Sequence, residues 1–567
     1  MGDAYRWVLS NGDFQAWCDP SSTTTRLLWI NGRPGTGKTM LLCGILDELR
    51  NSKASHRGNI AFFFCEKSNE RANNAEAVLR GLLFMLATGP QRRSVIRHIR
   101  DKYDNSGAGI FQGPSAWWSL RDMLNKALSK MDRGGEKGDG DDAGGGVTYL
   151  AVDALDECEH GLERLLALIA DSSSPSSTTT NAETGNPRVR WLVTSRGEDD
   201  IRKGLRVSRA GLGLSLNLDY DYAEEIDKAV DMYIHHCSAK LAKAKNKDEE
   251  YEVYYSKINE GLHKNKGEGT FLHVTLLARE LGAVERGKRL EELQGMAVDV
   301  RGLYRQAEAR IRNLDDDDDD EGEGEGEGGR MRESCLRALS AVAVAYRPLR
   351  DQELCALAGL GDPEEERARR VIHLCGSFFA MGDHKANFIH ESAREYLQLG
   401  SRTFEAGLRT EHYRLFSSCL DVMQTRLRRD MYGLGRPDIR AAEGRREGAE
   451  NNSVISAAEY ARDYWIDHLI ASGDQQHNDD DYYHVHRDTR GNRALSVFLK
   501  TQFLCWLEYL SLGGNMREAL SLWTKLVGFL KVGKYVMCPT LGENSLKRTH
   551  EVKKRKRKEV FLNKVRS

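Results

Sequence analysis

The segment Gly32–Thr39, GRPGTGKT, constrains this chain more than any other part of it. It fits G-x-x-x-x-G-K-[ST], in which glycines let backbone N–H groups turn inward and surround phosphate oxygens. The apolar run LLWI precedes it at 27–30 and helical spacing follows over 40–49, so the context is strand, loop and helix. A chance glycine-rich turn is the alternative, and the agreement of both flanks argues against it.

The pattern gives individual residues a role. A helix that starts at Lys38 points its positive end at a bound anion, and the Lys38 amine would bridge the β- and γ-phosphates. The Thr39 hydroxyl would ligate Mg²⁺. We therefore predict a nucleotide site that uses Gly32, Pro34, Gly35, Thr36, Gly37, Lys38, Thr39 and Met40.

The segment YLAVDALDEC at 149–158 is the second element. Asp153 ends its apolar strand, where an aspartate would hold Mg²⁺ through water. Glu157 or Asp156 could polarise an attacking water, or neither residue does so. The three alternatives stay open because many related ATPases carry the catalytic carboxylate directly after the first aspartate, where this chain has Ala154. A solvated acidic turn that caps the next helix is the structural alternative.

The segment WLVTSR at 191–196 is the third element. A strand that ends in Thr-Ser-Arg places Arg196 beside the nucleotide edge of a parallel sheet. A guanidinium there can sense or stabilise a γ-phosphate. Taken alone, Arg196 would be a surface arginine at a helix cap; the two preceding elements favour the sensor role.

Strand and helix patterns alternate through the first 221 residues. This order predicts an α/β fold with a parallel sheet covered on both faces, preceded by a lead-in helix within 1–25. Two polar segments, 133–146 and 172–187, cannot bury a core and are predicted to be disordered inserts. The expected strands are 27–30, 59–65, 147–153, 190–194 and 214–218, and the expected helices 40–49, 75–86 and 115–131.

After residue 221 the strand signals fade. Helices at 223–243 and 271–281 predict a helical lid over 222–314. The acidic run within 315–330 predicts a solvated linker. Residues 331–402 show helices followed by a hairpin at 377–381 and 386–389, a winged-helix-like order. We expect a helical domain over 403–535, with apolar periodicity at 460–469 and 503–512, and a basic tail over 536–567.

Bulk properties exclude several classes of protein. The 567 residues exceed one core, so about three or four domains are expected. A net charge of −2 gives no sign of a nucleic-acid or membrane-surface binder. No apolar run reaches the roughly 18 residues of a membrane helix, and no secretory signal is evident. The scattered cysteines indicate reduced thiols in a cytoplasmic protein. KKRKRK at 553–558 is a solvated tail, a nuclear-import signal or an RNA-binding patch.

The three motifs in this order resemble the NACHT and nephrocystin-like branch of the STAND NTPases, in the form abundant in filamentous fungi. The resemblance extends along nearly the whole chain apart from the inserts and the tail. GTFLHVTLLAREL at 269–281 is similar to the lid of those proteins, and CGSFFA…NFIHESAREYL at 375–397 to their winged-helix end. The segments 460–469 and 503–512 are similar to the helices that follow.

The resemblance implies a nucleotide switch. His390, in an F-x-H motif, would contact the β-phosphate of bound ADP and hold the module closed; by itself it would be a satisfied core or surface histidine. Exchange for ATP would release the module for self-association in fungal non-self recognition or cell death, with slow hydrolysis as the reset. Adenine over guanine also follows from the resemblance, since no Asn-Lys-x-Asp motif is present.

In the family that this chain resembles, such a module lies between an N-terminal effector domain and C-terminal repeats that sense a ligand, and this sequence departs from that layout. The phosphate loop starts close to Met1, and no WD, ankyrin or tetratricopeptide period follows residue 535. The chain is then a stand-alone regulator, a truncated product, or a subunit whose effector and sensor domains come in trans. Two further functions stay open: a non-hydrolysing nucleotide-binding scaffold, and a P-loop kinase for a small molecule, against which the winged-helix-like half argues.

Overall fold

The computed structural model divides the chain into two compact units, Met1–Glu405 and Ala406–Ser567, each of which is described by itself. The described residues are 5–19, 26–51, 59–89, 92–111, 113, 115–132, 147–173, 189–207, 213–242, 249–267, 269–284, 288–314, 327–404, 406–430, 452–473, 489–512 and 516–532. The predictions for 133–146, for most of 172–187 and 315–330, and for the tail with 553–558 lie outside them.

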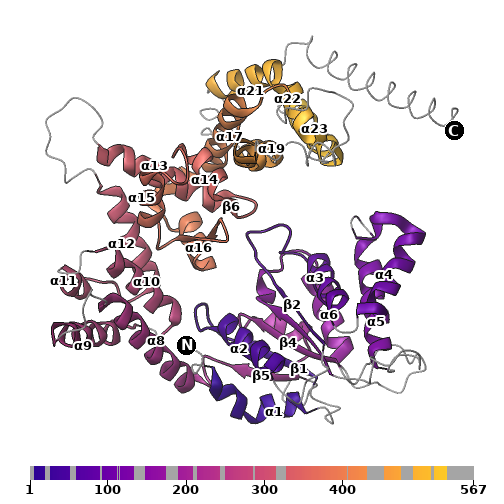
Figure 1. Cartoon of the computed structure of the whole chain (residues 1–567), viewed down its shortest axis with the longest axis vertical. Helices are drawn as coiled ribbons and strands as arrows, with labels where there is room; N and C mark the ends of the chain where they lie inside the picture. Colours follow the sequence, from indigo (N-terminus) through magenta and orange to yellow (C-terminus); the bar gives the residue numbers. More distant parts are fainter. Residues whose placement is uncertain are drawn as a thin grey trace. The chain divides into compact units, whose positions relative to one another are not determined.

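A five-stranded parallel sheet with the order β2-β3-β4-β1-β5 organises the first unit (Figure 1). Its strands are β1 (Leu27–Asn31), β2 (Asn59–Phe64), β3 (Thr148–Asp153), β4 (Val189–Ser195) and β5 (Gly213–Asn217). Because β4 lies between β1 and β3, the carboxyl ends of these three strands meet at one edge of the sheet. Ligands of open α/β sheets bind at this edge. The predicted α/β fold is confirmed.

Helices cover both faces of the sheet, because every side chain of β1, β3 and β4 is buried and successive side chains point to opposite faces. Leu27 and Trp29 of β1 face a core that also contains buried residues of α3, α5, α6 and α7. Leu28 and Ile30 point to the opposite face and are fully buried, and Figure 1 shows α1 and α2 on that side. The helices are α2 (Lys38–Asn51), α3 (Ala75–Thr88), α4 (Arg92–Ser106), α5 (Ala116–Asp132), α6 (Leu162–Ser173) and α7 (Asp199–Gly204).

The lead-in is tied to the sheet. It comprises η1 (Arg6–Ser10) and α1 (Gly12–Cys18), which Asn11 caps by accepting from two backbone N–H groups. The fully buried Trp17 donates its indole N–H to the Trp191 carbonyl oxygen, 3.0 Å away. Trp7 stacks on Tyr222 with ring centroids 5.1 Å apart. Residues 6–18 are therefore packed against the first unit through Trp7 and Trp17.

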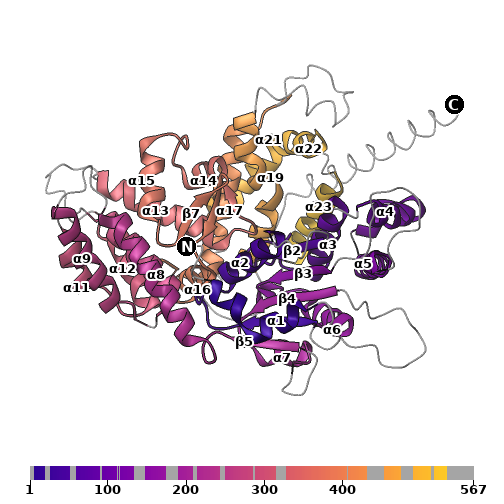
Figure 2. The same cartoon turned by 60° about the horizontal axis from the view of Figure 1, so that its bottom comes forward.

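Two further parts complete the first unit. The α8–α12 region contains α8 (Ala223–Ala242), α9 (Glu249–Lys264), α10 (Phe271–Ala283), α11 (Arg289–Gln294) and α12 (Val300–Arg312); α8 and α9 lie side by side in Figures 1 and 2. The hairpin region, residues 327–404, contains α13 (Glu327–Val344), β6 (Leu349–Arg350), α14 (Asp351–Ala358), α15 (Glu366–Leu374), β7 (Phe379–Gly382), β8 (Lys385–Phe388), α16 (Glu391–Leu399) and η6 (Arg402–Phe404).

The expected hairpin is present, with β7 paired antiparallel to β8. Asp383 and His384 both have positive φ, which suits a two-residue turn whose twist matches that of the strands. β6, too short for a recognisable pattern, adds a third strand beside β8.

Two helices extend past the segment boundaries that the sequence predicts. α13 begins at Glu327, inside the predicted acidic linker. α6 runs to Ser173, inside the predicted insert, and the Ser172 and Ser173 hydroxyls donate to carbonyls one turn earlier.

The second unit is helical. Its described helices are α17 (Gly407–Arg426), α19 (Asn452–Ser472), α21 (Thr489–Thr501), α22 (Phe503–Leu512) and α23 (Met516–Val532). The fully buried Trp465 and Trp506 meet edge to face, with ring centroids 5.8 Å apart, and form the centre of its core. The helices expected at 460–469 and 503–512 are both present. Among the described residues, no helix combines the length and the apolar character that a membrane span requires.

Candidate functional site

The phosphate loop has a backbone that only glycine allows at two positions. Gly35 and Gly37 have φ of +81° and +88°. A Cβ on Gly35 would lie 2.5 Å from Cβ of Leu272, and one on Gly37 would lie 2.9 Å from the Phe271 ring. Leu272 and Phe271 begin α10, so these glycines serve both the loop conformation and the close approach of a helix from another region.

Lys38 is the first residue of α2 and lines a pocket of about 570 Å³ at the carboxyl edge of the sheet. Its amine donates to the carbonyl oxygens of Gly32 (2.7 Å) and Arg33 (2.8 Å). Burial lowers the pKa of Lys38, although nearby carboxylates oppose the shift. Of the predicted loop residues, all except Gly32 line this pocket; Gly32 contributes its carbonyl to Lys38.

Asp153 lies opposite Lys38 at the end of β3, with 4% of its surface exposed. One of its carboxylate oxygens accepts from the Thr39 hydroxyl (2.7 Å) and the other from the Thr194 hydroxyl (2.5 Å). Burial raises the pKa of Asp153 despite these two donors. Oxygen ligands from a carboxylate and a hydroxyl suit Mg²⁺, so the donor set fits the predicted metal.

Thr194 was not recognised in the sequence. It is next to Asp153 because β3 and β4 are in parallel register, with Val152 opposite Val193. Its hydroxyl also accepts from the backbone N–H of Ala154, 2.9 Å away, and Ala154 adopts a left-handed conformation with φ of +53°. Thr194 therefore fixes both the Asp153 carboxylate and the turn that follows it.

Asp156 forms a hydrogen bond and an ion pair with Arg196. It accepts from the Arg196 backbone N–H (3.0 Å), and its second oxygen lies 3.2 Å from Nε of the same arginine. On its far side, Nη2 of Arg196 lies 3.0 Å from Glu395 Oε1 of α16. Burial would lower the pKa of Arg196, but the two carboxylates outweigh it and raise the pKa. Arg196 remains a cation in the pocket.

Glu157 is the better placed of the two candidate bases. Burial raises its pKa to about 7, with further contributions from Glu391, Asp156 and Asp153, although the backbone N–H of Lys67 donates to it (3.1 Å) and opposes the shift. A carboxyl group that titrates near neutral pH is suited to accept a proton from water.

His390 reaches this pocket from the hairpin region and caps the N-terminus of α16. Its Nδ1 accepts from the Ser392 backbone N–H (3.1 Å), which places the ring proton on Nε2. Burial and the positive charges of Lys38 and Arg196 lower the pKa of His390 to about 4. The ring is therefore a neutral donor at physiological pH.

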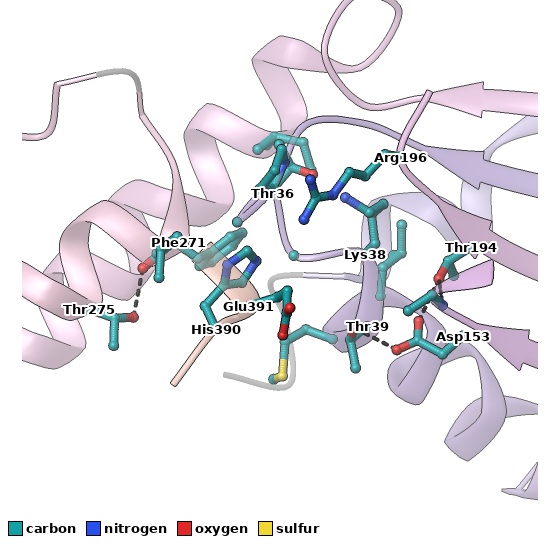
Figure 3. Close-up of a pocket in the computed structure, with 18 of the residues that line it drawn as sticks. Thr36, Lys38, Thr39, Asp153, Thr194, Arg196, Phe271, Thr275, His390 and Glu391 are labelled. Atoms are coloured by element: carbon teal, nitrogen blue, oxygen red, sulfur yellow. Dashed lines mark hydrogen bonds between the residues drawn. The ribbon is translucent and has the colours of Figure 1, made fainter. Parts of the chain in front are cut away.

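The pocket combines side chains from three regions of the first unit. Figure 3 shows His390 turned toward the space that Lys38 and Arg196 enter, with Phe271 beside it. Sequence reasoning missed part of the wall because long-range packing brings it together: Tyr5, Trp7, Leu41, Cys65, Thr194, Ile226, Ala229, Tyr233, Phe271, Leu272, Thr275, Ile389 and Glu391.

Glu308 of α12 joins the α8–α12 region to the hairpin region. Although only 3% exposed, it accepts from the hydroxyl groups of Tyr396 (2.6 Å), Ser401 (2.8 Å) and Thr403 (2.6 Å), and from the Thr403 backbone N–H (2.7 Å). Arg279 of α10 also donates to the Gly376 carbonyl oxygen, 2.8 Å away. The wall that carries His390 is therefore held by specific polar contacts.

The strand order, the glycine-dependent loop and the Lys38–Thr39–Asp153 arrangement together define an α/β P-loop fold of the NTPase class. Comparison with protein families agrees, since residues 3–196 match the family described as nephrocystin 3, N-terminal. The chain is also 33% identical over 544 residues to the vegetative incompatibility protein HET-E-1 of Podospora anserina. The resemblance to fungal NACHT and nephrocystin-like NTPases is thereby confirmed.

The extent of these similarities differs. The alignment with HET-E-1 covers 92% of this chain but only 36% of that protein, so the chain spans about a third of its relative's length. Among solved structures, a chain from the structure of Drosophila ORC bound to DNA is 14% identical, with coverage of 69% of this chain and 94% of that one. Its TM-score of 0.30 is too low to support any conclusion about this protein.

Proposed function

We propose that this chain is an ATP/ADP-binding signalling switch of the STAND type, with slow ATP hydrolysis as the resetting step. One observation carries the proposal: His390 of the hairpin region shares a pocket with Lys38 and Thr39 of the phosphate loop. A nucleotide held by the loop would contact both parts, so its state would control whether they stay together.

Different residues of the pocket would bind the phosphates, the metal ion and the base of the nucleotide. Lys38 and the N-terminal N–H groups of α2 would hold the phosphates, and the neutral His390 would donate Nε2–H to a β-phosphate oxygen. Thr39 and Asp153 would hold Mg²⁺, which neutralises phosphate charge when bound. Tyr5, Trp7, Tyr233 and Phe271 supply the aromatic part of the wall, which suits a purine base.

The biological setting of the proposal comes from the fungal relative. HET-E-1 is named as a vegetative incompatibility protein, and an equivalent role for this chain in fungal non-self recognition or regulated cell death is proposed by analogy. We propose that the ATP-bound form self-associates and that effector or sensor domains act in trans. A nucleic-acid partner forms no part of the proposal.

The nucleotide that co-purifies with the protein tests the switch. We expect ADP in the wild type and loss or replacement of ADP in His390→Ala, because the variant lacks the donor from the hairpin region. Chromatography of the nucleotide released by denaturation measures this. His373→Ala, an exposed histidine of α15, is the matched control and should retain ADP. Equal ADP content in all three proteins would contradict the role of His390.

One observation favours a non-hydrolysing scaffold as the second candidate. Ala154, rather than a carboxylate, directly follows Asp153, and Glu157 accepts a hydrogen bond from the Lys67 backbone N–H. A scaffold would bind nucleotide with the same loop and leave the γ-phosphate intact. Single-turnover cleavage of radiolabelled ATP separates the two functions.

Glu157→Gln is expected to slow this cleavage by about 10²–10⁴-fold, the usual contribution of a general base. Below pH 7 the Glu157 carboxyl group is protonated and cannot accept a proton. The wild-type cleavage rate should therefore rise as the pH increases, with an apparent pKa of about 7. Asp199→Asn, an exposed carboxylate of α7, is the control. Absence of cleavage by wild type and variant alike would favour the scaffold.

A further inference from the structure

Arg196 is held between two parts of the first unit. Asp156, on the same side as the sheet, lies 3.2 Å from Nε, and Glu395 of α16 lies 3.0 Å from Nη2. The Arg196 side chain is 30% exposed and that of Glu395 41% exposed. Asp156 follows β3 and Arg196 follows β4, so both belong to the part of the chain that forms the sheet, residues 26–221, which is called the nucleotide-binding domain below. Of the two ion pairs, only Arg196–Glu395 therefore crosses to the hairpin region.

His390, the N-cap of α16, and Glu395 of α16 differ in whether they can distinguish ADP from ATP. A β-phosphate is present in both ADP and ATP, so a donor such as His390 cannot tell the two nucleotides apart by that contact alone. A γ-phosphate brings additional negative charge toward the Arg196 guanidinium, which is the group that Glu395 occupies. Only the triphosphate therefore competes with Glu395.

The charges around Arg196 also oppose a γ-phosphate when α16 is in place. Glu391 and Glu157 also face this part of the pocket, while Lys38 and Arg196 supply its positive charge. Four carboxylates, those of Asp156, Glu157, Glu391 and Glu395, already lie around Arg196. A γ-phosphate added among them would meet like charges on α16.

We propose that Glu395 is the residue by which the closed form discriminates against ATP: it pairs with Arg196 when no γ-phosphate is present and is displaced when one arrives. This inference deepens the proposed switch and rests on it. His390 then favours a bound nucleotide of either kind, and the Arg196–Glu395 pair selects the diphosphate. Breaking the pair removes a contact between the nucleotide-binding domain and α16, which favours opening.

The test measures the affinity of the full chain for ADP and for the β,γ-imido analogue of ATP, both with Mg²⁺, by isothermal titration calorimetry. Glu395→Gln keeps the side chain's size but removes its charge. The ratio of the analogue's Kd to the Kd of ADP should fall by about three- to tenfold, the range expected for one partly exposed charge-assisted pair. Glu366→Gln, an exposed glutamate of α15, should leave the ratio unchanged.

A double-mutant cycle shows whether Glu395 acts through Arg196. In the Arg196→Gln background, adding Glu395→Gln should leave the ratio where it was. A ratio that does not fall in the single variant, or that falls equally in both backgrounds, overturns the inference while leaving nucleotide binding intact. Failure of the wild type to bind either nucleotide would instead overturn the proposed function.

Discussion

Lys38→Ala is expected to strip the protein of its co-purifying nucleotide and to weaken the binding of added ADP at least about 30-fold, which corresponds to about 2 kcal/mol or more. Lys38 is the residue of the phosphate loop whose charge lies inside the pocket. Its side chain is positioned by the Gly32 and Arg33 carbonyls rather than by a carboxylate, so its positive charge is available to a phosphate.

The loss should be specific to the loop. Alanine at position 38 leaves the Gly32 and Arg33 carbonyls without the amine, but these two hydrogen bonds are half-buried and exposed, respectively. The fold should therefore persist, and the thermal unfolding midpoint without nucleotide should change little. Lys203→Ala, which removes an exposed lysine of α7, is the matched control and should bind ADP normally. Unchanged nucleotide content in Lys38→Ala would refute the assignment of the loop.

Glu308→Ala is expected to destabilise the first unit by about 3–5 kcal/mol, because it leaves several buried or half-buried donors without their acceptor. The donors are the hydroxyl groups of Tyr396, Ser401 and Thr403 and one backbone N–H. The lost contacts join α12 to the helix that carries His390. ADP retention should therefore fall together with stability.

Thermal unfolding of the full chain measures this effect. Glu260→Ala, which replaces an exposed glutamate of α9, should leave the midpoint unchanged, and equal midpoints for the two variants would contradict the role of Glu308. Burial would raise the pKa of Glu308, but the donors from Thr403, Tyr396 and Ser401 outweigh it and lower the pKa. The stabilising contribution should therefore be full at neutral pH and fade as the pH falls below the ordinary glutamate range.

The sheet and the phosphate loop were predictable because their signals are local. A buried parallel strand reads as a continuous apolar run, and GRPGTGKT encodes its own conformation through Gly35 and Gly37. The ends of β1, β3 and β4 then had to meet, because parallel strands carry their carboxyl ends to one edge. The roles of Glu157, Arg196 and His390 remain predictions, although the structure places all three in one pocket.

Contacts between distant segments were not predictable. Arg196 and Glu395 are 199 positions apart, and Glu308 and Thr403 are 95 apart. A charged residue on an amphipathic helix has the same local pattern whether it faces water or a partner, so neither glutamate stood out in the sequence. Thr194 was missed for a related reason, since its role depends on the register of β4 against β3.

The crowding at Gly35 has a consequence for how such chains can diverge. With only 2.5 Å between a Cβ at this position and Cβ of Leu272, a larger side chain would need α10 to withdraw, and the positive φ would still penalise it. Replacement of Leu272 by a β-branched residue would likewise place extra atoms against Gly35 of the loop, where no space is free. Across a set of homologues, the two positions should show coupled variation, with the loop tolerating change only where the first turn of α10 has changed too.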